Sequence, residues 1–266
     1  MRASQYEHNG INLNYYQTGK GDRDIFIQHG LYDDALCWGN LPLDLGKNYL
    51  ITLIDARGFG FSSKPNYGYD IDTMTEDIAA LIMHLNPRQP IVIGQSMGAS
   101  LGCHLAARYP DLLKAVIMID PAFREPSSMD LKAELLSKRV NELRSQQSMS
   151  REEMIALIHS KHPDWPDEFV LPGADSRFRM SLSAFAILNS IDTTWKDDLT
   201  KIHCPMLLIT AEVNKGAIVS EEIADYAHLI NANVKSAFIS GAGHSIHKEQ
   251  YTKVLGAIEN FLAEIK

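Results

Sequence analysis

The stretch "PIVIGQSMGAS", residues 90–100, decides the fold because a strand pattern changes there into a helix pattern. Residues 90–93 form an apolar run typical of a strand that is buried on both faces. The segment "GQSMG" (94–98) then places Ser96 between two glycines, and a helical pattern continues until Pro110. A G-x-S-x-G turn between a strand and a helix is typical of a nucleophile elbow. We therefore predict Ser96 as a nucleophile at the carboxyl end of a strand.

The two glycines have a steric explanation in such a turn. The turn forces strained backbone angles on Ser96 and brings the helix close to the strand, so side chains at positions 94 and 98 would clash. The new helix also points its first amides at the site, which makes the amide of Met97 a predicted donor to an oxyanion. The alternative is a glycine-rich turn that contains a serine by chance. The strand before Ser96 and the helix after it favour the nucleophile.

Apolar runs of strand length alternate with helical patterns along the chain. The runs cover residues 24–28, 49–55, 90–94, 115–120, 206–210 and 237–240. This alternation predicts an α/β fold with a mostly parallel central sheet and helices on both faces. Near the N-terminus, Asn9-Gly10 predicts a hairpin and therefore antiparallel edge strands. Thr73 and Glu76 form a capping-box pattern for one helix.

Residues 122–200 interrupt this alternation, since they contain no convincing strand pattern. Helices are expected over 130–147, after a cap at Ser150, and over about 175–189. We predict that 122–200 form a helical cap inserted into a core domain made of residues 1–121 and 201–266.

Composition excludes several other classes of function. The chain has 266 residues, 45% of them hydrophobic, and a formal net charge of -8. Such an acidic surface disfavours nucleic acid or an anionic membrane as the main partner. No apolar run follows the N-terminus or approaches the roughly 20 residues of a membrane span. With three widely spaced cysteines, we expect a soluble, cytoplasmic protein that acts on a small molecule, and the oligomeric state stays open.

A catalytic serine needs a base, and His244 is the best candidate among ten histidines. It lies in "GAGHSIH" (241–247), after the last predicted strand and before the last predicted helix, at another carboxyl end of a strand. His247 is expected inside or at the cap of that helix. The segment "QHG" (28–30) ends a further strand, and the loop after it would supply a second oxyanion amide from Leu31.

Taken together, these motifs resemble the α/β-hydrolase superfamily, in its capped, esterase-like branch. The matching segments are "QHGLYDDALCW" (28–38), "DARGFGFSSKP" (55–65), "GQSMG" (94–98), "IDPAF" (119–123), "CPMLLITAE" (204–212) and "GAGH" (241–244). They occur in the family's order across nearly the whole chain. The resemblance implies Ser96 as nucleophile, His244 as base, the amides of Leu31 and Met97 as oxyanion hole, and a substrate-selecting cap.

The acid of the triad departs from the family's pattern. The family often carries it shortly after the strand predicted at 206–210, where this chain has Asn214. A neutral amide cannot stabilise the imidazolium that forms on His244. Asp120, at the end of the strand after the elbow helix, is our preferred acid, and Glu212 is the alternative. We expect Pro121 to hold the Asp120 backbone in an extended conformation.

The pattern predicts a cofactor-independent serine hydrolase that cleaves a small carboxylic ester or lactone through an acyl-enzyme on Ser96. The alternative is hydrolysis of a C–C or amide bond by the same triad. A keto-acid substrate would then need basic residues in the pocket, such as Arg124 and Arg177. The third hypothesis is a non-catalytic ligand receptor. We expect neither a cofactor nor a metal, because no carboxylate or cysteine completes a metal site. Candidate pocket residues are Tyr32, Trp38, Phe123, Trp165 and Phe178.

Overall fold

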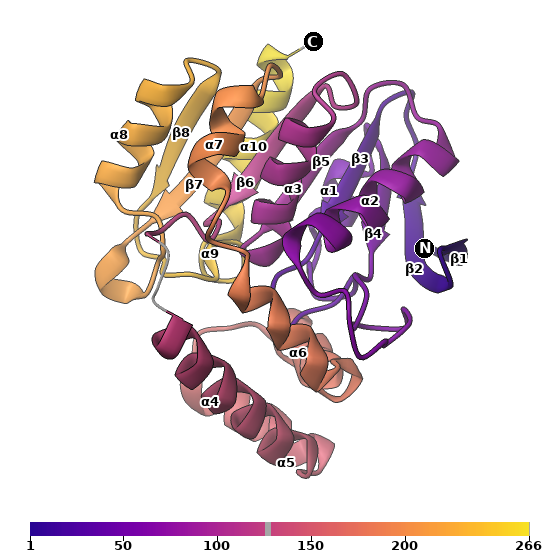
Figure 1. Cartoon of the computed structure of the whole chain (residues 1–266), viewed down its shortest axis with the longest axis vertical. Coiled ribbons are helices and arrows are strands. Elements are labelled where there is room, and N and C mark those ends of the chain that lie inside the picture. The colour runs from indigo at the N-terminus through magenta and orange to yellow at the C-terminus, as the bar shows by residue number, and fades with distance from the viewer. Residues whose placement is uncertain (126–128, 266) are drawn as a thin grey trace.

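The computed structural model describes residues 1–125 and 129–265, and in this part of the chain one eight-stranded sheet forms the centre of the molecule (Figure 1). The strand order is β1-β2-β4-β3-β5-β6-β7-β8. The strands are β1 (Arg2–His8), β2 (Ile11–Gly19), β3 (Asp24–Gln28), β4 (Leu50–Ile54), β5 (Ile91–Gln95), β6 (Ala115–Ile119), β7 (Met206–Ala211) and β8 (Val234–Ile239). Strands β1 and β2 pair antiparallel with each other, β2 pairs antiparallel with β4, and all other pairs are parallel. The mostly parallel α/β sheet is therefore confirmed.

Helices cover both faces of the sheet, as the sequence predicts. Side chains alternate between the faces along each strand. Val92 on β5 packs into one core cluster with Leu101, while Ile91 packs into a second cluster with Ile258. The helices are α1 (Leu41–Leu45), α2 (Ile71–Leu85), α3 (Met97–Arg108), α4 (Met129–Gln147), α5 (Arg151–Lys161), α6 (Asp167–Arg179), α7 (Trp195–Lys201), α8 (Glu221–Ile230), α9 (Ile246–Glu249) and α10 (Tyr251–Glu264), with short 3-10 helices η1 (Leu182–Asn189) and η2 (Val213–Lys215).

The helices α4, α5 and α6 gather beyond one end of the sheet, away from its two covered faces (Figure 1). Helices α5 and α6 share a small apolar core of their own, which consists of Met154, Ile158, Trp165, Val170 and Ala174. The described residues between β6 and β7 contain helices and no strand. This group of helices falls within the range that we predict as the cap.

The N-terminal hairpin forms where the sequence predicts it. His8 pairs with Ile11, and Asn9 and Gly10 between them have φ angles of 49° and 76°. Both central residues are thus left-handed, as a two-residue turn matching the strand twist requires.

Two helix boundaries differ from the prediction. Helix α2 begins at Ile71 and is capped by Asp70, whose side chain accepts a 2.8 Å hydrogen bond from the Thr73 amide, so the Thr73 capping box is wrong. Aspartate satisfies the free amides of a first turn as well as threonine does. The helix expected over about 175–189 consists of two pieces, α6 and η1. Met180 adopts an extended conformation between them, and Ser181 caps the second piece.

Three neighbouring parallel strands bring the important chain segments to one edge. Gln28 on β3 is in register with Gly94 on β5, and Gln95 is in register with Ile119 on β6. The loop after β3, Ser96 after β5 and Asp120 after β6 therefore lie at the same carboxyl edge, where open α/β sheets bind ligands.

Two general features complete the fold. In the part of the chain that the structure describes, no helix is long and apolar enough to cross a bilayer. The cysteines Cys37, Cys103 and Cys204 are free and buried.

Candidate active site

The turn at Ser96 is as strained as the sequence predicts. Ser96 has φ 51° and ψ -114°, a backbone conformation that non-glycine residues rarely adopt. The neighbouring glycines are sterically required. A Cβ at Gly94 would lie 2.2 Å from the carbonyl oxygen of Gly98, and a Cβ at Gly98 would lie 2.0 Å from that of Gln28. Strain held by such close backbone packing is common at functional sites.

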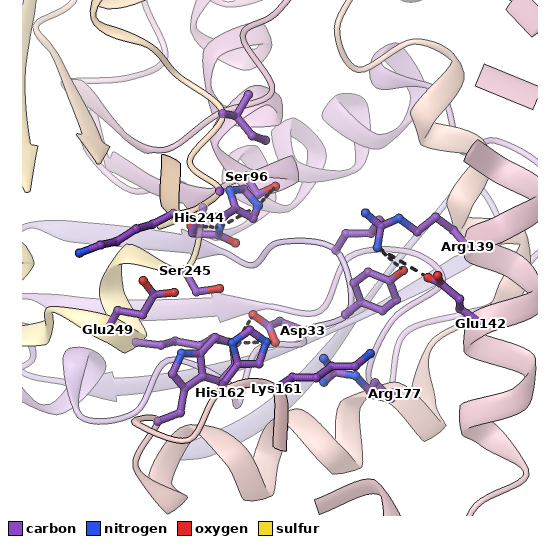
Figure 2. A pocket seen from close by; sticks show the side chains of 18 of the residues that line it. Asp33, Ser96, Arg139, Glu142, Lys161, His162, Arg177, His244, Ser245 and Glu249 are labelled. Atoms are coloured by element: carbon purple, nitrogen blue, oxygen red, sulfur yellow. Dashed lines mark hydrogen bonds and ion pairs between the residues drawn. The ribbon is translucent and has the colours of Figure 1, made fainter. Parts of the chain in front are cut away.

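Ser96, His244 and Asp120 form a hydrogen-bonded chain. Ser96 Oγ lies 3.0 Å from His244 Nε2, and His244 Nδ1 lies 2.6 Å from Asp120 Oδ2. Figure 2 shows the imidazole of His244 next to Ser96 at the wall of the cavity. Asp120 is fully buried, while the His244 side chain is about one-third exposed. The buried carboxylate can only accept, so Nδ1 carries a proton and Nε2 is free to accept one from Ser96.

The Asp120 backbone does not have the extended conformation that we expected from Pro121. Its φ is 44°, in the left-handed region, which aspartate tolerates better than most residues. The carboxylate explains how this conformation is held. It accepts hydrogen bonds from the amides of Ile218 (2.9 and 3.0 Å) and Val219 (2.9 Å), in addition to its contact with His244.

The alternative acid, Glu212, is engaged elsewhere. Its carboxylate accepts a 2.6 Å hydrogen bond from the Gly241 amide and pairs with Lys215 at 3.1 Å. Asn214, which stands where the family often has its acid, is exposed. Of the two candidate acids, Asp120 is the one whose side chain contacts His244 Nδ1.

The two predicted oxyanion donors come from different segments of the chain. Leu31 lies in the loop after β3 and lines the cavity. Met97 is the first residue of α3, so its amide has no partner within the helix, and its side chain is buried.

His29 holds the loop after β3 in place. Its Nε2 accepts from the Ala56 amide (3.2 Å), so its Nδ1 donates to the Gly30 carbonyl (2.8 Å).

A cavity of about 590 Å³ opens at Ser96 and His244 and extends between the sheet edge and the helices α4, α5 and α6 (Figure 2). Among the described residues that line it, six are basic and three are acidic. The basic residues are Arg124, Arg139, Lys161, Arg177, Lys215 and Lys248, and the acidic residues are Asp33, Glu142 and Glu249.

The structure corrects three of the five candidate pocket residues. Tyr32 and Trp165 line the cavity, whereas Trp38, Phe123 and Phe178 do not. Trp38 is buried in the sheet core, and Phe123 is fully buried against Trp195, with ring centroids 4.9 Å apart. Phe178 packs on the apolar core of helices α5 and α6. These rings therefore stabilise the fold, as most aromatic residues do.

The cavity wall contains a buried ion pair that the sequence did not indicate. Lys248 Nζ donates to both carboxylate oxygens of Asp33 (2.8 and 2.7 Å) and lies 4.8 Å from the centre of the Trp165 ring. Burial raises the pKa of Asp33, but the charge and hydrogen bonds of Lys248 outweigh it, so the pKa lies below its ordinary value. The two residues are 215 positions apart, and no local pattern links them.

Gln95 is a second residue at the site that the sequence did not reveal. It precedes Ser96, and its Nε2 donates to the carbonyl of His244 at 3.2 Å. Its Oε1 occupies the space that a Cβ on Gly30 would need, 2.1 Å away. Gln95 therefore packs between the loop after β3 and the His244 loop. Its position inside "GQSMG" is the signal that could have identified it.

No group of three or more His, Cys, Asp or Glu side chains that could hold a metal ion occurs among the described residues.

The comparisons with known proteins agree with this architecture. The sequence model of the alpha/beta hydrolase fold matches residues 25–187. The 2-(acetamidomethylene)succinate hydrolase of Mesorhizobium japonicum is 27% identical over 95% of this chain and 92% of its own length. The N-formylmaleamate deformylase of Pseudomonas putida is 26% identical over 96% of this chain and 94% of its own.

A solved structure agrees in fold over the whole chain. The crystal structure of an E-2-(acetamidomethylene)succinate hydrolase superposes with a TM-score of 0.85, at 24% identity, and covers 98% of this chain and 99% of the other. The match to the family model extends over more than half of the chain, so this protein belongs to the α/β-hydrolase family.

Proposed function

We propose that this protein is a cofactor-independent serine hydrolase that cleaves a small carboxylic ester or lactone through an acyl-enzyme on Ser96. The observation that carries the proposal is the hydrogen-bonded chain from Ser96 through His244 to Asp120, with contacts of 3.0 and 2.6 Å. A nucleophile, a base and an orienting acid in this order are what acyl transfer requires.

Each residue has a distinct role in the proposed reaction. Ser96 Oγ attacks the carbonyl carbon while His244 Nε2 takes its proton, and Asp120 stabilises the imidazolium that results. The amides of Leu31 and Met97 hold the negative oxygen of the tetrahedral intermediate. His244 then protonates the leaving group, activates water for attack on the acyl-enzyme, and returns the proton to Ser96.

We also propose that residues 122–200 form a cap over a core made of residues 1–121 and 201–266. The support is that the cavity is lined from both parts, by Ser96 and His244 on one side and by Arg139, Trp165 and Arg177 on the other. The cap would select the substrate. The expected cytoplasmic location is part of this proposal and is supported by the free, buried cysteines.

The second candidate is amide or C–C hydrolysis by the same residues. A keto-acid substrate of such a reaction would need basic residues in the pocket, and the candidates Arg124 and Arg177 both line the cavity. The two relatives support this candidate by name, since one is a hydrolase of 2-(acetamidomethylene)succinate and the other a deformylase of N-formylmaleamate. The fold alone does not distinguish these reactions, because bond specificity depends on the pocket.

A substrate screen tests both candidates. Purified protein is assayed on aryl esters, lactones and amides, with Ser96→Ala as the blank, and is labelled with a fluorophosphonate. We expect labelling that Ser96→Ala abolishes and hydrolysis of at least one class. Folded protein that is neither labelled nor active would overturn the proposal in favour of the non-catalytic receptor.

A further inference from the structure

We propose that Arg139 and Arg177, which both lie close to the ring of Tyr32, form a carboxylate-binding subsite, so that the substrate of Ser96 carries a negatively charged group beyond its reacting carbonyl. This inference rests on the proposed function for the reaction, whereas binding of the carboxylate does not depend on catalysis.

The two guanidinium groups converge on one aromatic ring. The Arg139 Cζ lies 5.8 Å from the centre of the Tyr32 ring, and the Arg177 Cζ lies 5.5 Å from it. Arg139 Nη1 also donates to the Tyr32 hydroxyl at 3.3 Å. Figure 2 shows both arginines at the part of the cavity away from His244. A ring that orients two guanidinium groups leaves their N–H donors available for a planar anion.

Two of the six bases that line the cavity, Arg177 and Lys161, have no countercharge among the described residues. Asp33 is held by Lys248, and Glu249 accepts from the Gly243 amide. Arg139 pairs with Glu142 at 3.8 Å, Lys215 with Glu212 at 3.1 Å, and Arg124 with Asp192 at 3.9 Å. Within the described residues neither Arg177 nor Lys161 has a carboxylate within ion-pair distance, and Arg177 Nη1 donates to the carbonyl of Gly173. The cavity is therefore positive in a chain whose net charge is -8.

His162 supports the same conclusion from inside the cavity. Its ring is stacked on Trp165, with centroids 3.9 Å apart. Burial lowers the pKa of His162, and the charges of Arg177, Lys248 and Lys161 lower it further, opposed by Glu249. A neutral imidazole among these cations leaves the excess positive charge to be balanced by a ligand.

The subsite is connected to the reacting centre through a single loop. Tyr32 follows Leu31, the proposed oxyanion donor, and has a strained φ of 71°. Its carbonyl accepts a 2.6 Å hydrogen bond from Ser176, the residue before Arg177 on α6. The loop after β3 therefore carries both the proposed oxyanion donor and the ring that contacts the two arginines, which line the same cavity as Ser96. This favours esters or amides whose acyl group carries a second, free carboxylate.

The first test measures binding without turnover. Succinate, glutarate and the uncharged dimethyl succinate are titrated calorimetrically into Ser96→Ala protein. We expect the dicarboxylates to bind about tenfold or more tightly than the diester, and Arg139→Gln and Arg177→Gln each to weaken succinate about tenfold or more. Arg139→Lys and Arg177→Lys should retain part of the affinity.

The matched control is Arg144→Gln. Arg144 is exposed on the same helix as Arg139 and contacts Asn141, so this variant removes one positive charge without changing the cavity. It should leave succinate affinity unchanged. Absence of succinate binding, or an equal loss in Arg144→Gln, would overturn the subsite. Thermal melts verify that each variant is folded.

The second test uses turnover and separates the two proposals. The wild-type protein should prefer monomethyl glutarate to methyl hexanoate in kcat/KM, and the two arginine variants should lose this preference while the neutral ester is still cleaved. Labelling and hydrolysis without any preference for the acid would refute the subsite alone. Succinate binding without labelling of Ser96 would refute the hydrolase alone.

Discussion

Asp120 Oδ2 lies 2.6 Å from His244 Nδ1, and the two residues are 124 positions apart. The carboxylate comes from the end of β6, while the loop after β7 donates the amides of Ile218 and Val219 to the same carboxylate. The loop in which the family often carries its acid thus supports, in this chain, an acid from the neighbouring strand. Two amide hydrogen bonds and complete burial fix its orientation toward the imidazole.

The first prediction concerns this acid. Asp120→Asn should lower kcat by about 10³- to 10⁴-fold, because an amide can neither hold the reactive tautomer of His244 nor stabilise its charge. Glu212→Gln should change kcat only a few-fold, because Glu212 contacts Gly241 and Lys215. Steady-state kinetics on one ester measures both, and thermal melts check folding. Equal or reversed losses would refute the role of Asp120.

The residues of the candidate site could be predicted because each lies where a strand ends. Buried strands leave apolar runs in the sequence, and parallel strands bring their carboxyl ends to one edge. Ser96 and Asp120 directly follow β5 and β6, and His244 lies in the loop after β8. The positions of the strand ends were therefore sufficient to predict that these three residues, which are distant in sequence, lie close together.

The pocket could not be predicted in the same way, because side-chain direction depends on packing. Trp38 and Phe123 are near the candidate site in sequence, yet they face the core. Arg139 lies on a helix whose apolar pattern does not reveal which side meets the sheet edge. The pair of Asp33 and Lys248 joins segments 215 positions apart. Only the tertiary packing of the whole chain determines these contacts.

The second prediction concerns the buried pair of Asp33 and Lys248. Asp33→Asn should lower the free energy of unfolding by about 3–5 kcal/mol, because it leaves a buried ammonium without its countercharge. Lys248→Met should also destabilise, and the double variant should be more stable than the sum of the single losses predicts. Urea unfolding of the four proteins measures this coupling. Strict additivity would show that the pair does not interact energetically.

The third prediction concerns acid sensitivity at His247. Burial, followed by the charge of Lys248, lowers the pKa of His247 to about 3, and its Nδ1 has no hydrogen-bond partner in the described structure. The unfolded chain binds a proton at about pH 6.5, so stability present above that pH is lost as the pH falls toward 3. His247→Leu should therefore flatten the decline of Tm between pH 7 and 4. The exposed His203 provides the control, since His203→Gln should leave the decline unchanged.

The fourth prediction concerns His104, whose pKa is raised in the folded protein, whereas that of His247 is lowered. Burial alone would lower the pKa of His104, but hydrogen bonds and charges from Asp198 on α7 and Asp72 on α2 outweigh it and raise the pKa. Arg108, which also pairs with Asp72, is the nearby cation on the same helix as His104. The protonated imidazole joins three helices, so its contribution is complete below about pH 6.5 and is lost as the pH rises through the folded pKa.

His104→Gln should accordingly lower Tm at pH 6 more than at pH 9, whereas His247→Leu should alter only the acidic side of the profile. Thermal melts of the wild type and both variants across this range distinguish the two histidines. Parallel profiles for the wild type and His104→Gln between pH 6 and 9 would contradict the prediction. Because protonation of His104 stabilises the fold and protonation of His247 destabilises it, the two substitutions should change the acidic part of the Tm profile in opposite directions.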